Sequence, residues 1–517
     1  MKKMKIFKKI SFAAILSITA LSISSCQALL DYIFGNIDLG FGPKYNPDDY
    51  ATVTQEAGDY SKFTYLDLNA ASYDGVTPSR GTMNIIVVPV QWRDLPSFSQ
   101  SQLEAIDASF NGNKEDNTNE YWESCKSFYY KSSNGILNFN FNITDIYTPS
   151  YSSTRFINEA DDYGNETSNL LDDIYENGLS INSGSLNFRD SKWDSNSDGY
   201  VDGIWLVYNQ RDSSKVDTTH FWAYVANYYG NNTNSRFGKY GNCALSFLYD
   251  DSSKGYDAHT IIHETGHMLG LDDYYDYNHG SNHYSYDGAL NMMDLNIGDH
   301  DAFSKFSLGW TKSLVVNESK TITLKPFEES YDSIIIPSNS YNGSAFGEYL
   351  MIEYYTPTGL FKLDAMNNYR NNYPKFFTSS GLRVWHIDSR LTYATYYDSG
   401  VTQYGSYLPN NIESIPNSTS TSTKITYVTV AHTNSPDDNY RNKDGIPLIE
   451  LVSKTNSKLY NTRYAANKDL FVAGDTINSS SISRYLKSGK FNDGTPFNVS
   501  ISVNSITDEG AELTFTF

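Results

Sequence analysis

The stretch HETGHMLGLDD, residues 263–273, decides how the centre of this chain folds. Residues four apart lie on one face of an α-helix, so a helix through this stretch points His263 and His267 in the same direction. Glu264 is rotated from His263 by roughly a quarter-turn or more. It therefore reaches the space in front of the two imidazoles without joining them as a ligand.

The end of this stretch supplies a third candidate ligand. Gly270 can take the left-handed conformation that ends a helix, after which the chain can fold back and present Asp273. Asp272 is the weaker candidate, suited to capping the turn or orienting a ligand. His259 lies one turn before His263, but no glutamate follows it directly, so we interpret it as a structural or supporting residue.

The full pattern, H-E-x-x-H-x-x-G-x-x-D, predicts a zinc site. A catalytic zinc takes three protein ligands and keeps one position open, and a carboxylate oxygen is an acceptable ligand. We expect His263, His267 and Asp273 to be the ligands and Glu264 to be the general base. The alternative is a helix with two histidines and no metal. The glycine and aspartate at fixed offsets favour zinc, because H-E-x-x-H alone arises by chance.

A second stretch, GALNMMDLNIGDHDAFSKFSLGW (288–310), makes a family resemblance specific. Together, HETGHMLGLDDYYDY, NMMD and SLGW resemble the immune inhibitor A family of bacterial secreted metallopeptidases. IIVVPVQWRD and GLRVWHID resemble further family segments, so the likeness runs from roughly residue 80 to the end. It implies a metzincin-like zinc endopeptidase acting outside the cell, with Met293 forming the Met-turn beneath the zinc.

The group that would stabilise the oxyanion stays open. Some metzincins have a tyrosine two residues after the Met-turn methionine, but Leu295 stands there in this chain. His300, Tyr274 and Tyr275 are the alternatives.

Hydrophobic patterning divides the chain. Strand patterns such as MNIIVVPV alternate with helical patterns such as SQSQLEAIDASFNG until about residue 312, and short strand patterns follow, from SKTITLKPF to AELTFTF. With the resemblance, this predicts an α+β fold: a zincin/metzincin-like catalytic domain with a mixed twisted sheet and an active-site helix, then all-β, sandwich-like modules. The predicted parts are a signal peptide (1–25), a spacer or pro-region (26–78), a zinc peptidase domain (79–312) and a β-rich region (313–517).

The N-terminus has the features of an export signal. Five lysines precede an apolar stretch from about Ile10 to Ile23, which is too short for a comfortable membrane span. The following ISSC resembles a bacterial lipobox, in which Cys26 would carry lipid and tether the exported protein to the cell surface. The alternative is a conventional signal peptide with an incidental cysteine.

The stretch DSNSDGYVDG, residues 194–203, predicts a calcium loop. Oxygen-bearing side chains alternate there, a glycine supplies the sharp turn, and the twelfth position is Trp205 instead of the glutamate of an EF-hand. The alternative is a solvated acidic turn. The expected ligands are Asp194, Asn196, Asp198, Asp202 and the Tyr200 carbonyl.

Charge and cysteine content narrow the function. With 39 basic and 60 acidic residues the net charge is −21, which argues against nucleic acid and against broad adhesion to anionic lipid. Cys125 and Cys243 either form one disulfide or remain two buried thiols.

These observations predict a monomeric, lipid-anchored zinc endopeptidase that acts on extracellular proteins or peptides. The competing interpretation is a surface adhesin or glycan-binding lipoprotein with a non-catalytic zinc site. A third, an amidase acting on cell-wall peptides, would use the same chemistry.

Overall fold

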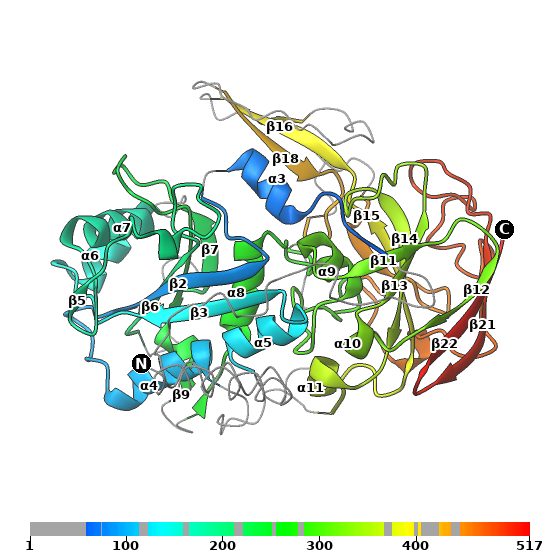
Figure 1. Cartoon of the computed structure of the whole chain (residues 1–517), viewed down its shortest axis with the longest axis horizontal. Helices are drawn as coiled ribbons and strands as arrows, with labels where there is room; N and C mark the ends of the chain where they lie inside the picture. The colour runs from blue at the N-terminus through cyan, green and yellow to red at the C-terminus, as the bar shows by residue number, and fades with distance from the viewer. Residues whose placement is uncertain are drawn as a thin grey trace, which may run out of the picture. The chain divides into compact units, whose positions relative to one another are not determined.

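The computed structural model describes most of the chain after residue 57 (Figure 1). The predicted signal peptide, Cys26 and the predicted spacer up to residue 57 lie outside the described residues. The described residues belong to one compact unit that begins at Ala51. They are 58–73, 75–112, 123–158, 165–210, 221–250, 255–277, 284–366, 375–397, 402–404, 423–435 and 445–517.

A five-stranded mixed sheet carries the first half of this unit. Four of its strands are parallel, and β7 pairs antiparallel with β8 at one edge. In spatial order the strands are β3 (Leu137–Ile143), β2 (Gly81–Val90), β6 (Ile204–Tyr208), β8 (Lys239–Ala244) and β7 (Tyr224–Asn227).

Helices cover both faces of this sheet. Ile86 and Val88 of β2 share a core cluster with Leu170 and Ile174 of α7. Because both faces of the sheet are covered, most residues of β2 are apolar and follow one another without alternating polar positions. Helices α4 (Gln100–Asn111), α5 (Cys125–Ser132) and α8 (His259–Leu269) cover one face, and α6 (Ser153–Asn158) and α7 (Asn165–Asn177) the other.

Two further sheets pack face to face in the second half. Ile334, Ile352 and Val384 of a six-stranded sheet share one buried cluster with Val503 and Leu513 of a four-stranded sheet. The six-stranded sheet runs β1 (Asp59–Tyr60), β11 (Lys312–Val315), β13 (Ser333–Pro337), β14 (Glu348–Tyr355), β15 (Gly381–Asp388), β19 (Ile449–Leu451). The other runs β12 (Lys320–Leu324), β22 (Gly510–Thr516), β21 (Ser500–Thr507), β20 (Thr476–Ile477).

The start of the described chain is part of this fold. Strand β1 pairs with β11, and helix α3 (Tyr65–Ser72) buries Tyr65 and Leu68. The Ser72 hydroxyl accepts a hydrogen bond from the Tyr427 backbone at 3.1 Å, in β18 (Thr423–Thr429) of a three-stranded sheet that also holds β16 (Leu391–Tyr397) and β17 (Thr402–Tyr404). Residues 58–73, which lie in the predicted spacer or pro-region, therefore form a strand and a helix of this unit.

The α+β class is confirmed, but the region after residue 312 is β-rich and not all-β. Short helices α10 (Phe327–Ser330) and α11 (Lys362–Met366) interrupt the strands. Helix α10 is a single turn that ends where Tyr331 takes φ 58°, too short to leave a periodic signal in the sequence. No helix of the described residues is long and apolar enough to cross a membrane.

Glu353 links the second half to the first. Its carboxylate accepts hydrogen bonds from the Trp385 indole at 2.6 Å and from the backbone N–H of Ala302 at 3.1 Å, and it pairs with Arg383 at 2.7 Å. The Glu353 and Arg383 side chains are fully buried. Ala302 is the first residue of α9 (Ala302–Leu308), so one carboxylate holds both β15 and the start of this helix.

We predict that Glu353→Gln lowers the free energy of unfolding by about 3–5 kcal/mol, because the buried charge of Arg383 would lose the carboxylate with which it pairs directly. Denaturant unfolding measures the loss. The exposed Glu329→Gln is the matched control, expected to change stability by less than about 0.5 kcal/mol. Equal stability of the two variants would show that the buried pair contributes nothing.

Candidate metal centre

Helix α8 presents both histidines of the motif from one face, as the sequence predicts. The His263 and His267 ring centres lie 5.0 Å apart. The helix ends at Leu269, and Gly270 takes φ 107°, a conformation that side chains other than glycine rarely adopt. The chain then reverses and brings Asp273 back toward the helix.

Three ligand atoms converge after this reversal. Asp273 Oδ1 lies 3.0 Å from His263 Nε2 and 3.2 Å from His267 Nε2. Ligand atoms held at about 2.0–2.1 Å by a tetrahedral zinc lie roughly 3.3 Å apart, so the spacing fits one such ion. Among the described residues, this is the one group of three histidine, cysteine or acidic side chains with ligand atoms within 4.8 Å of one another.

Backbone carbonyls orient both imidazoles. His263 Nδ1 lies 2.8 Å from the Met292 carbonyl, and His267 Nδ1 lies 2.7 Å from the Leu271 carbonyl. A carbonyl can only accept, so each Nδ1 carries the hydrogen of its bond. In the neutral rings, the lone pair then lies on Nε2, the atom that faces Asp273.

Tyr277 holds the second oxygen of the aspartate. Its hydroxyl donates to Asp273 Oδ2 at 2.7 Å, which leaves Oδ1 facing the histidines. Sequence reasoning missed Tyr277. It follows Asp273 by four residues in irregular chain, where no periodicity predicts which side chains meet.

Met293, the predicted Met-turn residue, packs against helix α8 at Gly266. It is fully buried, and a β-carbon added to Gly266 would lie 2.5 Å from its sulfur. The glycine between the two histidines therefore makes room for the thioether. The neighbouring Met292 contributes its carbonyl to His263.

Burial and mutual charge shift the pKa values of the site. Burial alone would lower the pKa of His267, but the Asp273 carboxylate raises it to about 9. Burial favours neutral Asp273, but the two imidazoles hold its pKa well below the usual range. The metal-free site therefore holds protons that a metal ion would displace. Burial raises the pKa of Glu264, although the histidines oppose it.

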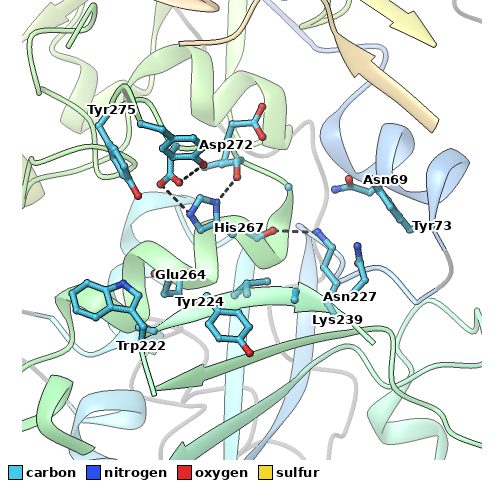
Figure 2. Close-up of a pocket in the computed structure, with 17 residues that line it drawn as sticks. Asn69, Tyr73, Trp222, Tyr224, Asn227, Lys239, Glu264, His267, Asp272 and Tyr275 are labelled. Carbon is cyan, nitrogen blue, oxygen red and sulfur yellow. Dashed lines mark hydrogen bonds and ion pairs between the residues drawn. The ribbon is translucent and has the colours of Figure 1, made fainter. Parts of the chain in front are cut away.

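Two of the three predicted ligands, His267 and Asp273, line a pocket of about 550 Å³ (Figure 2). Glu264 lines it beside them, so the predicted base shares one cavity with two of the predicted metal ligands. Strand β7 forms another wall, from Tyr224 to Asn227. Strand β7 is the edge of its sheet, and no other strand of the described residues pairs with its outer side; an edge of this kind can pair with another extended chain.

The three residues considered for stabilising the oxyanion lie in different environments. His300 and Tyr274 are fully buried. His300 packs against Phe128 and Trp310, and the Tyr274 hydroxyl bonds with Ser304, so both belong to the core. Tyr275 lines the pocket and is the candidate that stays open.

His259 and Asp272, the other polar residues considered near the motif, lie in different places: one in the core and one at the pocket. His259 is buried at the first turn of α8, where its backbone N–H donates to Asp257. Asp272 lines the pocket but belongs to no metal-ligand cluster of the described residues.

The predicted calcium loop is folded by its own side chains. The Asp194 carboxylate accepts the N–H groups of Asp198 and Gly199, each at 3.0 Å. The Asp198 carboxylate accepts the Tyr200 N–H at 2.9 Å and the Asn196 side-chain amide at 3.0 Å. These bonds hold the loop in a tight turn.

Asp202 occupies a different part of that loop. It is buried and accepts the Ser195 N–H at 3.0 Å. Burial raises the pKa of Asp202 to about 7. The negative charges of Asp194 and Asp198 also raise this pKa, whereas the hydrogen bonds from Ser195 lower it. In the described residues these three carboxylates do not form a metal-ligand cluster, and calcium binding stays a prediction.

The two described cysteines are free thiols. Cys125 and Cys243 are both buried, and the Cys125 sulfur lies 3.4 Å from the Thr265 hydroxyl. Of the two alternatives, the structure has the pair of buried thiols.

Comparison with known proteins assigns no family to the chain. No protein-family model matches it, and no curated protein matches its sequence. The resemblance to immune inhibitor A therefore rests on the motifs themselves.

We predict that Tyr277→Phe weakens zinc binding about ten-fold, because Asp273 loses the hydrogen bond that orients it. Competition with a chromophoric chelator measures the affinity. The exposed Tyr229→Phe is the matched control and should bind zinc as the unmodified protein does. Equal affinities for all three proteins would mean that Tyr277 does not support the ligand.

For the loop at 194–203, we predict that calcium at roughly one hundred times its Kd stabilises the zinc-loaded protein by about 2.7 kcal/mol. The ion would neutralise the loop carboxylates. Melting with and without a calcium chelator that spares zinc measures the effect, and Asp194→Asn should remove it. A melting temperature that is the same with and without calcium would identify the loop as an acidic turn.

Proposed function

We propose that this protein is a zinc endopeptidase that hydrolyses peptide bonds, with a metzincin-like catalytic domain. The observation that carries the proposal is the convergence of His263, His267 and Asp273 on one point, beside a cavity that His267 and Asp273 line together with Glu264. Two imidazole nitrogens and one carboxylate oxygen form a donor set that suits zinc and leaves a fourth position open.

Zinc bound to this set supplies the Lewis acid that activates water and polarises the scissile carbonyl. Glu264 accepts the proton of the attacking water and passes it to the leaving amine. Met292 and Leu271 keep the imidazoles in place through their carbonyls.

The edge strand supports a peptide as the substrate. A peptide laid along β7 would pair with it antiparallel or parallel through main-chain hydrogen bonds, which recognise any extended chain. The pocket beside the strand would then receive the substrate side chains. This favours hydrolysis within a polypeptide over hydrolysis of a small, isolated amide.

The N-terminal sequence supports a location outside the cytoplasm for this enzyme. We infer that the enzyme is exported and tethered to the bacterial surface by lipid on Cys26, with extracellular proteins or peptides as substrates. The positive N-terminus, the short apolar stretch and ISSC support this.

We predict that the zinc-loaded protein cleaves a generic protein substrate and that Glu264→Gln lowers its kcat by at least about a hundred-fold, because general-base catalysis is lost. A glutamine side chain has nearly the same shape as the glutamate it replaces, so zinc should bind both proteins at one per chain. Fluorescence from a labelled, unfolded protein measures cleavage, and metal analysis measures zinc.

The outcomes separate the interpretations. Zinc binding without cleavage of protein, peptide or peptidoglycan would favour the surface-binding interpretation. Cleavage of peptidoglycan alone would identify an amidase. Equal activity of the two proteins would exclude Glu264 as the base.

A further inference from the structure

The pocket has a second polar end, away from Glu264. Figure 2 shows Lys239, Asn227 and Asn69 on the opposite side of His267 from Trp222 and Tyr275. Lys239 comes from β8, Asn227 from the edge strand β7 and Asn69 from α3. Three elements far apart in sequence thus bring an ammonium and two amides to one end of the cavity.

The ammonium of Lys239 has a partial set of partners. Among the described residues that line the pocket, Lys239 is the one with a lysine or arginine side chain. It is 8% exposed, and Nζ donates to the His267 carbonyl at 3.1 Å. That bond caps the end of α8 and uses one of three N–H donors. No carboxylate of the described residues forms an ion pair with it, although Asp272 lies near.

The two amides complete a polar end. Asn227 lies directly opposite Lys239 in the pairing of β7 with β8, and its side-chain oxygen is buried without a hydrogen-bond partner. Asn69 lies against the end of α8, where a β-carbon on Gly270 would meet its amide nitrogen at 2.2 Å. The absence of a partner for the Asn227 oxygen holds for the described residues. Because the side-chain amide of Asn227 can rotate by 180°, it can also present its N–H donors to a ligand.

We propose that Lys239, Asn227 and Asn69 form a subsite that binds a carboxylate of the substrate and so determines specificity. The proposal rests on the proposed peptidase function. A buried cation with unused donors is stabilised by an anion, and a carboxylate accepts charge-assisted hydrogen bonds from an ammonium and ordinary ones from amides.

The length of β7 limits how far the recognised carboxylate can lie from the scissile bond of the substrate. The strand from Tyr224 to Asn227 spans about 10 Å, so the carboxylate belongs to a residue within about three positions of the scissile bond. It is either the side chain of a substrate Asp or Glu or the C-terminal carboxylate of a peptide. The same subsite would serve both.

The test compares paired peptides with the full, zinc-loaded protein. Each pair has Glu or Gln at one of the three positions on either side of the cleaved bond, and a further pair has a free or an amidated C-terminus. We expect kcat/KM to favour the carboxylate about ten-fold or more in one pair, as one charge-assisted hydrogen bond would produce. The pair that responds identifies the source. Equal cleavage within every pair would overturn the proposal.

Variants separate recognition from stability. In Lys239→Gln, the ratio of kcat/KM for the carboxylate peptide to that for its neutral partner should fall to about one. In Asp272→Asn, which removes a competing anion, this preference should increase. Lys131→Gln, at a lysine outside the pocket, is the matched control and should keep the preference. If thermal melting shows that Lys239→Gln is unfolded, Asn69→Ala, at a partly buried residue, should still reduce the preference. An unchanged preference in the folded variant would overturn the proposal.

A binding measurement keeps this proposal distinct from the catalytic one. Zinc-loaded Glu264→Gln should bind the Glu peptide more tightly than the Gln peptide by calorimetry, without turnover. Cleavage without carboxylate preference would leave the peptidase and remove the subsite. Preferential binding without cleavage by the unmodified protein would leave the subsite and remove the peptidase, and equal binding would remove the subsite.

Discussion

The arrangement of the site depends on two hydrogen bonds from imidazole Nδ1 atoms to backbone carbonyls. Without them, His263 and His267 could rotate, and either nitrogen could face the cavity. The two acceptors come from different places: Leu271 follows the helix directly, whereas Met292 belongs to a separate segment 29 residues beyond His263. The helix, the reversal after it and the segment around Met293 must therefore be folded together before the site has its geometry.

Much of this could be predicted from short-range patterns. The i, i+4 spacing placed the histidines on one face, and the glycine at 270 ended the helix where expected. The apolar run around Ile86 predicted a buried strand, and the structure has it as β2, with helices on both faces of its sheet. Such inferences succeed because each depends on a few neighbouring residues and on the geometry of one element.

Other features depend on contacts that no local pattern contains. Tyr277 reaches Asp273 through an irregular turn. Lys239 lies in KYGNCA, a buried strand with too many polar and small residues to look like one. Residues 58–73 look like a polar spacer, although Thr64 and Asp67, whose carboxylate accepts the Thr64 N–H at 2.7 Å, form a helix-start signal that could have indicated α3. In each case tertiary packing outweighs local composition.

Glu353 also bears on how such a protein can be divided or recombined. A chain cut after residue 312 would retain the motif helix and α9, but Ala302 would lose its acceptor and the interior face of α9 would meet solvent in place of β14. The part of the chain that contains the candidate metal site is thus not expected to fold as an independent unit. Gene fusions, whether natural or engineered, would have to carry the β-rich half along with the histidines.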